Sequence, residues 1–150
     1  MRQDEYDAYT ARREAEYADS LAGSLPPDAA KEKARQDHAE FLPQGLATER
    51  QRLLIAEDDA GHVVGTAWVG LEEPRTRTTE IAWLYDIRVE ERRRRSGYAR
   101  AILTAVEALA RDAGASRLGL NVFGHNRPAI ALYETSGYEV TTQQMVKRLR

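Results

Sequence analysis

The sequence has 150 residues, of which 42% are hydrophobic and 31% are charged, and its formal net charge is −2. This length predicts a single domain over residues 1–150 that buries roughly 70% of its unfolded surface. The absence of cysteine excludes disulfides, a cysteine nucleophile and a cysteine-ligated metal site. The three histidines are widely separated, so we expect no metal. No apolar stretch is long enough to be a signal peptide or a membrane span, which predicts a cytoplasmic protein without membrane contact.

The first half of the chain predicts two helices and a hairpin. Residues 4–21 place tyrosine and leucine side chains at helical spacing, and a second helix is expected to begin near Pro27 or Asp28. Residues 52–57 and 63–71 are strand-like and flank the turn Asp58-Asp59-Ala60-Gly61, which predicts an antiparallel pair.

In the second half, strands and helices alternate. A strand over residues 79–89 is followed by an amphipathic helix over residues 97–113, with Gly114 as its C′ residue, and by a short strand over residues 118–122. Asn126 is a good N-cap for a further helix, and residues 138–149 are expected to hold two more short strands. A parallel crossover in this half and a hairpin before it together predict a mixed sheet with helices on both faces.

Four arginines, Arg92 to Arg95, lie in the turn between the strand at 79–89 and the helix at 97–113. The N–H groups of a helix's first turn have no helical partner, and the helix dipole favours an anion there. Gly97 lets a ligand approach the backbone closely because it has no Cβ. The turn therefore predicts a pyrophosphate site. A solvated charged turn and an RNA contact are the alternatives. The acidic net charge and the lack of an aromatic stacking motif argue against nucleic acid.

Two motifs in this half of the chain resemble those of the Gcn5-related N-acetyltransferases (GNAT superfamily). Residues 94–99, RRSGYA, match the pattern [Q/R]-x-x-G-x-[G/A], and residues 126–138 carry N-x-x-A-x-x-L-Y-x-x-x-G-Y. The resemblance implies a central sheet of about six to seven strands with an antiparallel N-terminal half and a splayed parallel pair in the middle. Residues 1–48 would form acceptor-side helices, and residues 51–140 a cofactor-binding core.

The resemblance also implies which residues hold coenzyme A. Backbone amides from about Arg95 to Arg100 would bind the pyrophosphate, the main chain near Ile87 and Val89 would pair with the pantetheine arm, and a bulge would splay the strand that carries them. Asn126 would contact the arm through its amide. The full set of expected cofactor-binding residues is Ile87, Arg88, Val89, Arg94, Arg95, Ser96, Gly97, Tyr98, Ala99, Arg100, Asn126, Ala129 and Tyr133.

Tyr133 is the candidate general acid, because it resembles the family tyrosine set near the CoA sulfur. A phenol has a pKa of about 10 and keeps its proton at neutral pH, so it is able to donate to a departing thiolate. The base is less defined, since Trp83 aligns with the glutamate that serves in some relatives. We take Glu80 as the candidate base. Asp86, the more distant His125 and Glu72, and a water chain are the alternatives.

The implied activity is acetyl-CoA-dependent N-acetylation of a primary amine on a small molecule or a peptide. Transfer would be direct, in a ternary complex, because no cysteine is present to carry the acyl group. A non-catalytic CoA-binding sensor and an enzyme that uses another acyl donor are the alternative functions. The acceptor, which depends on loops without a transferable pattern, and the choice between monomer and homodimer stay open.

Overall fold

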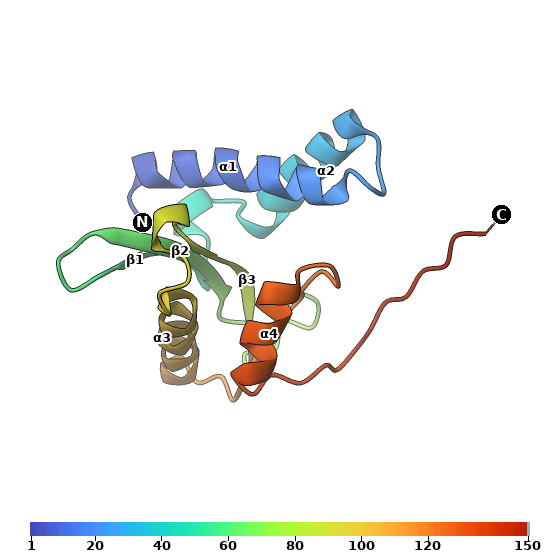
Figure 1. Cartoon of the computed structure of the whole chain (residues 1–150). Helices are drawn as coiled ribbons and strands as arrows, with labels where there is room; N and C mark the ends of the chain where they lie inside the picture. The colour runs from blue at the N-terminus through green and yellow to red at the C-terminus, as the bar shows by residue number, and fades with distance from the viewer. Residues whose placement is uncertain (150) are drawn as a thin grey trace. The chain divides into compact units, whose positions relative to one another are not determined.

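The computed structural model describes residues 1–149, and these divide into two compact units, Met1–Leu120 and a second unit that begins at Asn121. The first contains three α-helices and four strands, and the second contains one α-helix (Figure 1). No helix among the described residues is long and apolar enough to cross a bilayer.

A mixed four-stranded sheet forms the centre of the first unit. Its strands are β1 (Gln51–Glu57), β2 (Val63–Gly70), β3 (Ile81–Val89) and β4 (Arg117–Leu120), in the spatial order β1-β2-β3-β4. β1 and β3 both pair antiparallel with β2, whereas β4 pairs parallel with β3. The predicted mixed sheet, with an antiparallel first half and one parallel pair, is confirmed.

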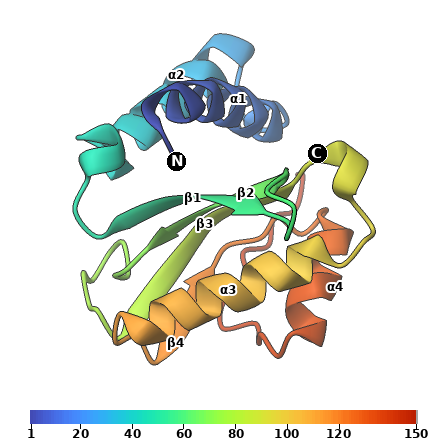
Figure 2. The ribbon, with the colours of Figure 1, turned by 90° about the vertical axis from the view of Figure 1, so that its left-hand side faces the viewer.

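Helices cover both faces of this sheet, as predicted. α1 (Gln3–Leu21) and α2 (Pro27–Phe41) lie on one face, and α3 (Tyr98–Asp112) lies on the other (Figure 2). Tyr9, Leu42, Leu53 and Trp68 form a buried cluster on the α1 side. The side chains of α3 that the helical spacing predicts to be apolar are buried at Ile102, Leu103, Val106 and Ala110.

Glycines with positive φ lie next to both ends of α3. Gly97 is the N-cap with φ 81°, and Gly114 follows the C-cap with φ 94°. Just after the C-terminal end of α3, the N–H of Gly114 donates to Arg111 O, and the N–H of Ala115 donates to Ala110 O at 3.0 Å. This pair of bonds is the Schellman arrangement, which satisfies carbonyls at a helix end. The predicted C-terminal role of Gly114 is therefore confirmed.

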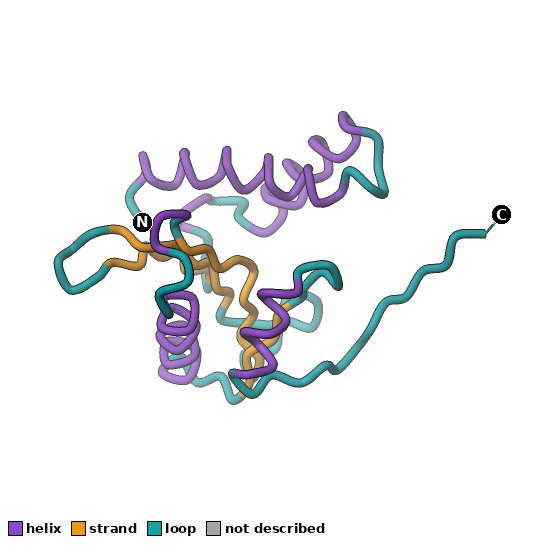
Figure 3. Tube along the Cα trace, viewed as in Figure 1, coloured by secondary structure: helices purple, strands orange, loops and turns teal. Residues whose placement is uncertain are grey.

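The second unit is built around α4 (Arg127–Thr135). Asn126 caps it by accepting the N–H of Ala129 at 3.3 Å, as the sequence predicts. The two strands expected in residues 138–149 are absent, and this segment is drawn as loop throughout (Figure 3). Its apolar side chains are exposed, for example Met145 at 90% and Val146 at 96%. A strand needs a neighbouring edge to satisfy its backbone, and the residues described in this unit provide no other strand. The expected total of six to seven strands is not confirmed.

No strand precedes α1 in the described chain. The amino group of Met1 lies 3.5 Å from the carbonyl of Leu53 on β1, and the Met1 side chain packs against the core cluster. Short 3-10 helices, η1 (Gly45–Ala47) and η2 (Glu91–Arg93), lie before β1 and after β3.

Candidate active site

The turn between β3 and α3 has the conformation expected of an anion-binding loop. Arg95 has φ 63°, a left-handed conformation that costs a residue with a side chain roughly 1–2 kcal/mol. Gly97 adopts the same region at φ 81°, and a Cβ placed there would meet nothing within 4 Å. The backbone conformation therefore favours glycine at position 97, and the space beside it is open. Strained residues of this kind concentrate at functional sites.

Several backbone donors in this turn are available to a ligand. The first bond of α3 within the turn is the one from Ala101 N–H to Gly97 O at 3.1 Å. In the described chain, the N–H groups of Arg95, Ser96, Gly97, Tyr98 and Ala99 have no acceptor. These donors lie at the positive end of the α3 dipole, where a phosphate is favoured.

The arginines of the turn differ in their surroundings. Arg93 forms an ion pair with Asp58 of the β1–β2 turn at 3.6 Å. Arg94 donates from Nε to Val89 O at 3.3 Å, and its side chain is exposed. Arg92 and Arg95 are exposed and make no ion pair with the described residues. Positive charge therefore surrounds the free backbone donors.

β3 presents an open backbone edge next to this turn. The N–H of Glu90 donates to Val64 O at 2.8 Å, and β2 and β3 are antiparallel. Because the bonded pairs alternate in an antiparallel ladder, the peptide groups of Ile87 and Val89 point away from β2. The β4 ladder reaches only Leu84 on β3, so this edge is unpaired within the first unit. The Arg94 side chain already donates to the Val89 carbonyl, whereas the N–H and C=O groups of Ile87 stay open.

The bulge expected in this strand is present. Trp68 pairs with Asp86 but Val69 pairs with Leu84, so Tyr85 is the extra residue on β3. A bulge lets consecutive side chains project from one face. Tyr85 stacks on Trp68 at 4.4 Å, and Asp86 meets α1 on the same face. The bulge thus ends the β3–β4 ladder and turns Asp86 towards α1.

Asp86, the carboxyl group next to the bulge, has a raised pKa. The Tyr9 hydroxyl donates to Asp86 Oδ2 at 2.9 Å, and Tyr9 is only 2% exposed. Burial raises the pKa of Asp86, while the charge of Arg13 and the Tyr9 hydrogen bond act in the opposite direction. Burial also raises the pKa of Tyr9, which therefore keeps its proton. A carboxyl with a raised pKa is a better proton acceptor than an ordinary aspartate.

Two other candidate bases have different environments. Glu80 is exposed just before β3, and its carbonyl accepts the N–H groups of Ser116 and Arg117. Along an extended strand it lies roughly 20 Å from Asp86. Glu72 is 5% exposed, and its carboxylate is held by Arg50 at 3.8 Å and Arg77 at 2.6 Å.

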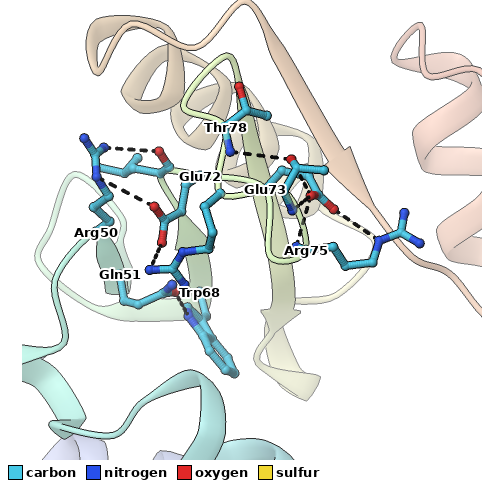
Figure 4. Close-up of polar contacts among 10 residues, drawn as sticks. Arg50, Gln51, Trp68, Glu72, Glu73, Arg75 and Thr78 are labelled. Carbon is cyan, nitrogen blue, oxygen red and sulfur yellow. Dashed lines mark hydrogen bonds and ion pairs between the residues drawn. The ribbon is translucent and has the colours of Figure 1, made fainter.

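Figure 4 shows that Glu72 belongs to a polar network at the end of β2. The Glu73 carboxylate accepts the N–H of Thr76 at 2.6 Å and of Arg75 at 3.0 Å, which lowers its pKa. Gln51 accepts the Trp68 indole N–H at 2.7 Å in the same view. These contacts anchor the β2–β3 loop, so Glu72 is better explained as a structural residue.

The remaining candidates lie together on the second unit. Ala129 is in the first turn of α4, and Tyr133 is one turn later on the same helix. The Tyr133 ring lies 5.6 Å from the ring of Tyr138, and both are partly buried. His125 is exposed and stacks on Phe123. The structure thus gathers the predicted residues into two groups: β3 with the turn into α3, and the start of α4.

Comparison with known proteins identifies the class to which this arrangement belongs. The model of the acetyltransferase (GNAT) family matches residues 9–138. The chain therefore belongs to the GNAT family of acetyltransferases, as its motifs predicted.

Particular relatives cover nearly all of the chain. The uncharacterized N-acetyltransferase YycN of Bacillus subtilis (strain 168) is 32% identical over 99% of this chain and 96% of its own length. The crystal structure of YycN superposes with a TM-score of 0.91 over 100% of this chain and 96% of that one. Aminoglycoside N(6')-acetyltransferase type 1 of Stenotrophomonas maltophilia is 31% identical over 91% of each chain. The structure of AAC(6')-Iy with a CoA bisubstrate analogue shares the fold, with a TM-score of 0.60 at 18% identity over 100% of this chain and 95% of that one.

Proposed function

We propose that this chain transfers the acetyl group of acetyl-CoA directly to a primary amine. The observation that carries the proposal is the row of free backbone N–H groups from Arg95 to Ala99 at the start of α3. These donors would hold the CoA pyrophosphate, assisted by the exposed side chains of Arg92 and Arg95. The open Ile87 peptide would pair with the pantetheine arm as an added strand does. A bound CoA analogue in a fold relative supports this cofactor.

The attacking amine must first lose a proton, because primary amines are mainly protonated at neutral pH. We assign this step to Asp86, directly or through one water, since burial raises its pKa and Tyr9 holds it in place. The neutral amine then forms an N–C bond at the thioester carbonyl. The tetrahedral intermediate collapses as the C–S bond breaks, and the second amine proton leaves.

Tyr133 is proposed to donate its proton to the departing thiolate and to regain one from solvent. A phenol has a pKa of about 10, so Tyr133 keeps its proton at neutral pH and donates it as charge accumulates on sulfur. The overall reaction converts an ammonium group and acetyl-CoA into an amide, free CoA and one released proton. Asn126 is proposed to contact the cofactor arm with the part of its amide that does not cap α4.

Thiol release from acetyl-CoA over a panel of amines tests this function. The proposal predicts stoichiometric release of CoA and formation of N-acetyl product with at least one amine. A protein that binds CoA but releases no thiol with any amine would be a sensor, and the enzymatic proposal would be wrong. Longer acyl-CoA thioesters in the same assay test the donor.

A matched pair of variants separates the two main candidate bases. Asp86→Asn is expected to lower kcat by about 10²-fold or more, as for loss of a general base. Glu80→Gln is expected to retain the wild-type rate, because Glu80 is exposed and distant from the bulge. The reverse result would reassign the base to Glu80. If both variants keep the wild-type rate, a water chain is favoured as the route for the proton.

A further inference from the structure

The space between α1 and the sheet contains buried polar atoms that lack hydrogen-bond partners. They include Arg13 Nε on α1, Thr66 Oγ1 on β2 and Arg88 Nε on β3, each almost inaccessible to solvent. Thr66 is 4% exposed and is the cross-strand partner of Arg88. Buried polar groups in native proteins are nearly always paired, so an unpaired group calls for an explanation such as a functional role.

These atoms share one face of the sheet. Thr66 and Trp68 are two residues apart on β2 and therefore project from the same side. The Arg13 guanidinium lies over the Trp68 ring, 4.6 Å from its centroid. Asp86 and Arg88 are likewise two residues apart on β3, and Arg88 forms an ion pair with Glu16 of α1. The unpaired atoms thus lie on the same side as Asp86.

One cation among these groups, Arg13, has no ion-pair partner in the described part of the chain. Its guanidinium also lies over the Tyr17 ring at 5.9 Å, and its charge acts on Asp86. Arg12 lies over the Tyr9 ring at 5.8 Å and adds a further cation. The anions nearest to these cations are already engaged: Glu16 pairs with Arg88, and Asp86 accepts from Tyr9. Glu90 and Glu91 also act on the charge of Arg88. A free guanidinium with an unused Nε donor is suited to an anionic group.

We propose that Arg13, Thr66 and Arg88 bind an acidic group of the acceptor, so that the substrate is a small amine that also carries a carboxylate or a phosphate. The inference rests on the proposed function and names the substrate class of that same site. Asp86 would receive the ammonium end of the acceptor while the guanidinium groups hold its acid end. A polycationic acceptor would meet like charge at Arg13. The expected acceptor therefore differs from the aminoglycosides named for two of the relatives.

Matched acceptor pairs test this inference. Phenylalanine is compared with phenethylamine, and O-phosphoethanolamine with ethanolamine, by kcat/KM for thiol release. In at least one pair, the acidic member is expected to have a kcat/KM about 10-fold higher or more, because of charge-assisted hydrogen bonds. The pair that shows this preference identifies the acidic group as a carboxylate or a phosphate. Equal rates within both pairs, or faster acetylation of kanamycin, would overturn the inference and leave the acetyltransferase function intact.

Variants connect the preference to these residues. Arg13→Gln and Arg88→Gln are expected to lower the ratio for the preferred pair about 10-fold or more, and Arg88→Lys to restore part of it. Arg35→Gln is the control, because Arg35 is exposed on α2 and pairs with Glu32. A purely structural role would lower both rates equally and keep the ratio. If no amine releases thiol, calorimetry of the CoA-loaded protein with the same acceptor pairs tests the anion site without the reaction. Tighter binding of the acidic member, lost in the two arginine variants, supports the site. Equal binding of both members refutes it.

Discussion

Substitution of Gly97 by glutamate tests the pyrophosphate site directly. Gly97 has φ 81°, so any side chain costs roughly 1–2 kcal/mol in conformational strain, a loss of about 2–8 °C in Tm. The added carboxylate would lie about 5 Å from a pyrophosphate that carries two negative charges. At the dielectric constant of water this repulsion is about 1.7 kcal/mol, and less screening increases it. Gly97→Glu is therefore expected to weaken CoA binding by about 20-fold or more.

Gly114→Glu is the matched control at the other end of the same helix. Gly114 has φ 94°, and a Cβ there would also meet nothing within 4 Å. Its strain is the same, and a carboxylate at a helix C-terminus adds a further cost of about 0.3–1 kcal/mol. Calorimetry should show a wild-type Kd for CoA in Gly114→Glu and a large loss in Gly97→Glu. Equal Kd values in the two variants, with similar losses in Tm, would refute the assignment of the pyrophosphate to this turn.

Four further predictions concern Asp86, Tyr9, Tyr133 and Gly119. Because burial raises the pKa of Asp86, the wild-type protein loses stability as pH rises above the pKa of this group in the unfolded chain. The difference in Tm between Asp86→Asn and wild type should therefore increase from pH 4 to pH 8. A difference in Tm that stays constant over this range would contradict the raised pKa. Tyr9→Phe removes a hydrogen-bond donor that lowers the pKa of Asp86, so the acidic limb of the pH profile of kcat/KM should move to higher pH. The variant should also lose about 1–3 kcal/mol of stability. An acidic limb that does not move would mean that Asp86 is not the base. Tyr133→Phe should reduce kcat by about 10²-fold with little change in Tm, and full activity would leave Tyr133 a packing role. Gly119→Ala should cost about 1–3 kcal/mol of unfolding free energy, because its Cβ would lie 2.5 Å from the Trp83 ring; an unchanged Tm would show that the ring moves freely.

The elements of the first unit could be predicted because their signals are local. Helical periodicity placed the apolar face of α3, and Gly97 and Gly114 marked its ends. The two motifs located the turn into α3 and the start of α4 for the same reason, since each is continuous in sequence. The two strands predicted over residues 138–149 are absent from the described residues. A local sequence pattern does not supply the neighbouring edge that a strand requires.

The polar layer beneath α1 was not predictable, because its members are distant in the sequence. Tyr9 and Asp86 are 77 residues apart, and only the bulge at Tyr85 turns Asp86 towards α1. Glu72 had the residue type of a base, yet Arg50 and Arg77 hold it in a structural network that no local pattern shows. The helical spacing of the tyrosines in residues 4–21 carried no sign of the hydrogen bond from Tyr9 to Asp86 on β3. Spacing identifies a face of an element, whereas the partner on that face depends on the tertiary fold.

Titration of the ¹⁵N-labelled protein with CoA is the most direct measurement of the central claim, because it observes the backbone donors individually. The account predicts that the amide resonances of Arg95 to Ala99 shift most, as they gain phosphate acceptors, and that the amides around Gly114 stay unchanged. Binding of CoA with these five amides unmoved, and the largest shifts elsewhere, would contradict it.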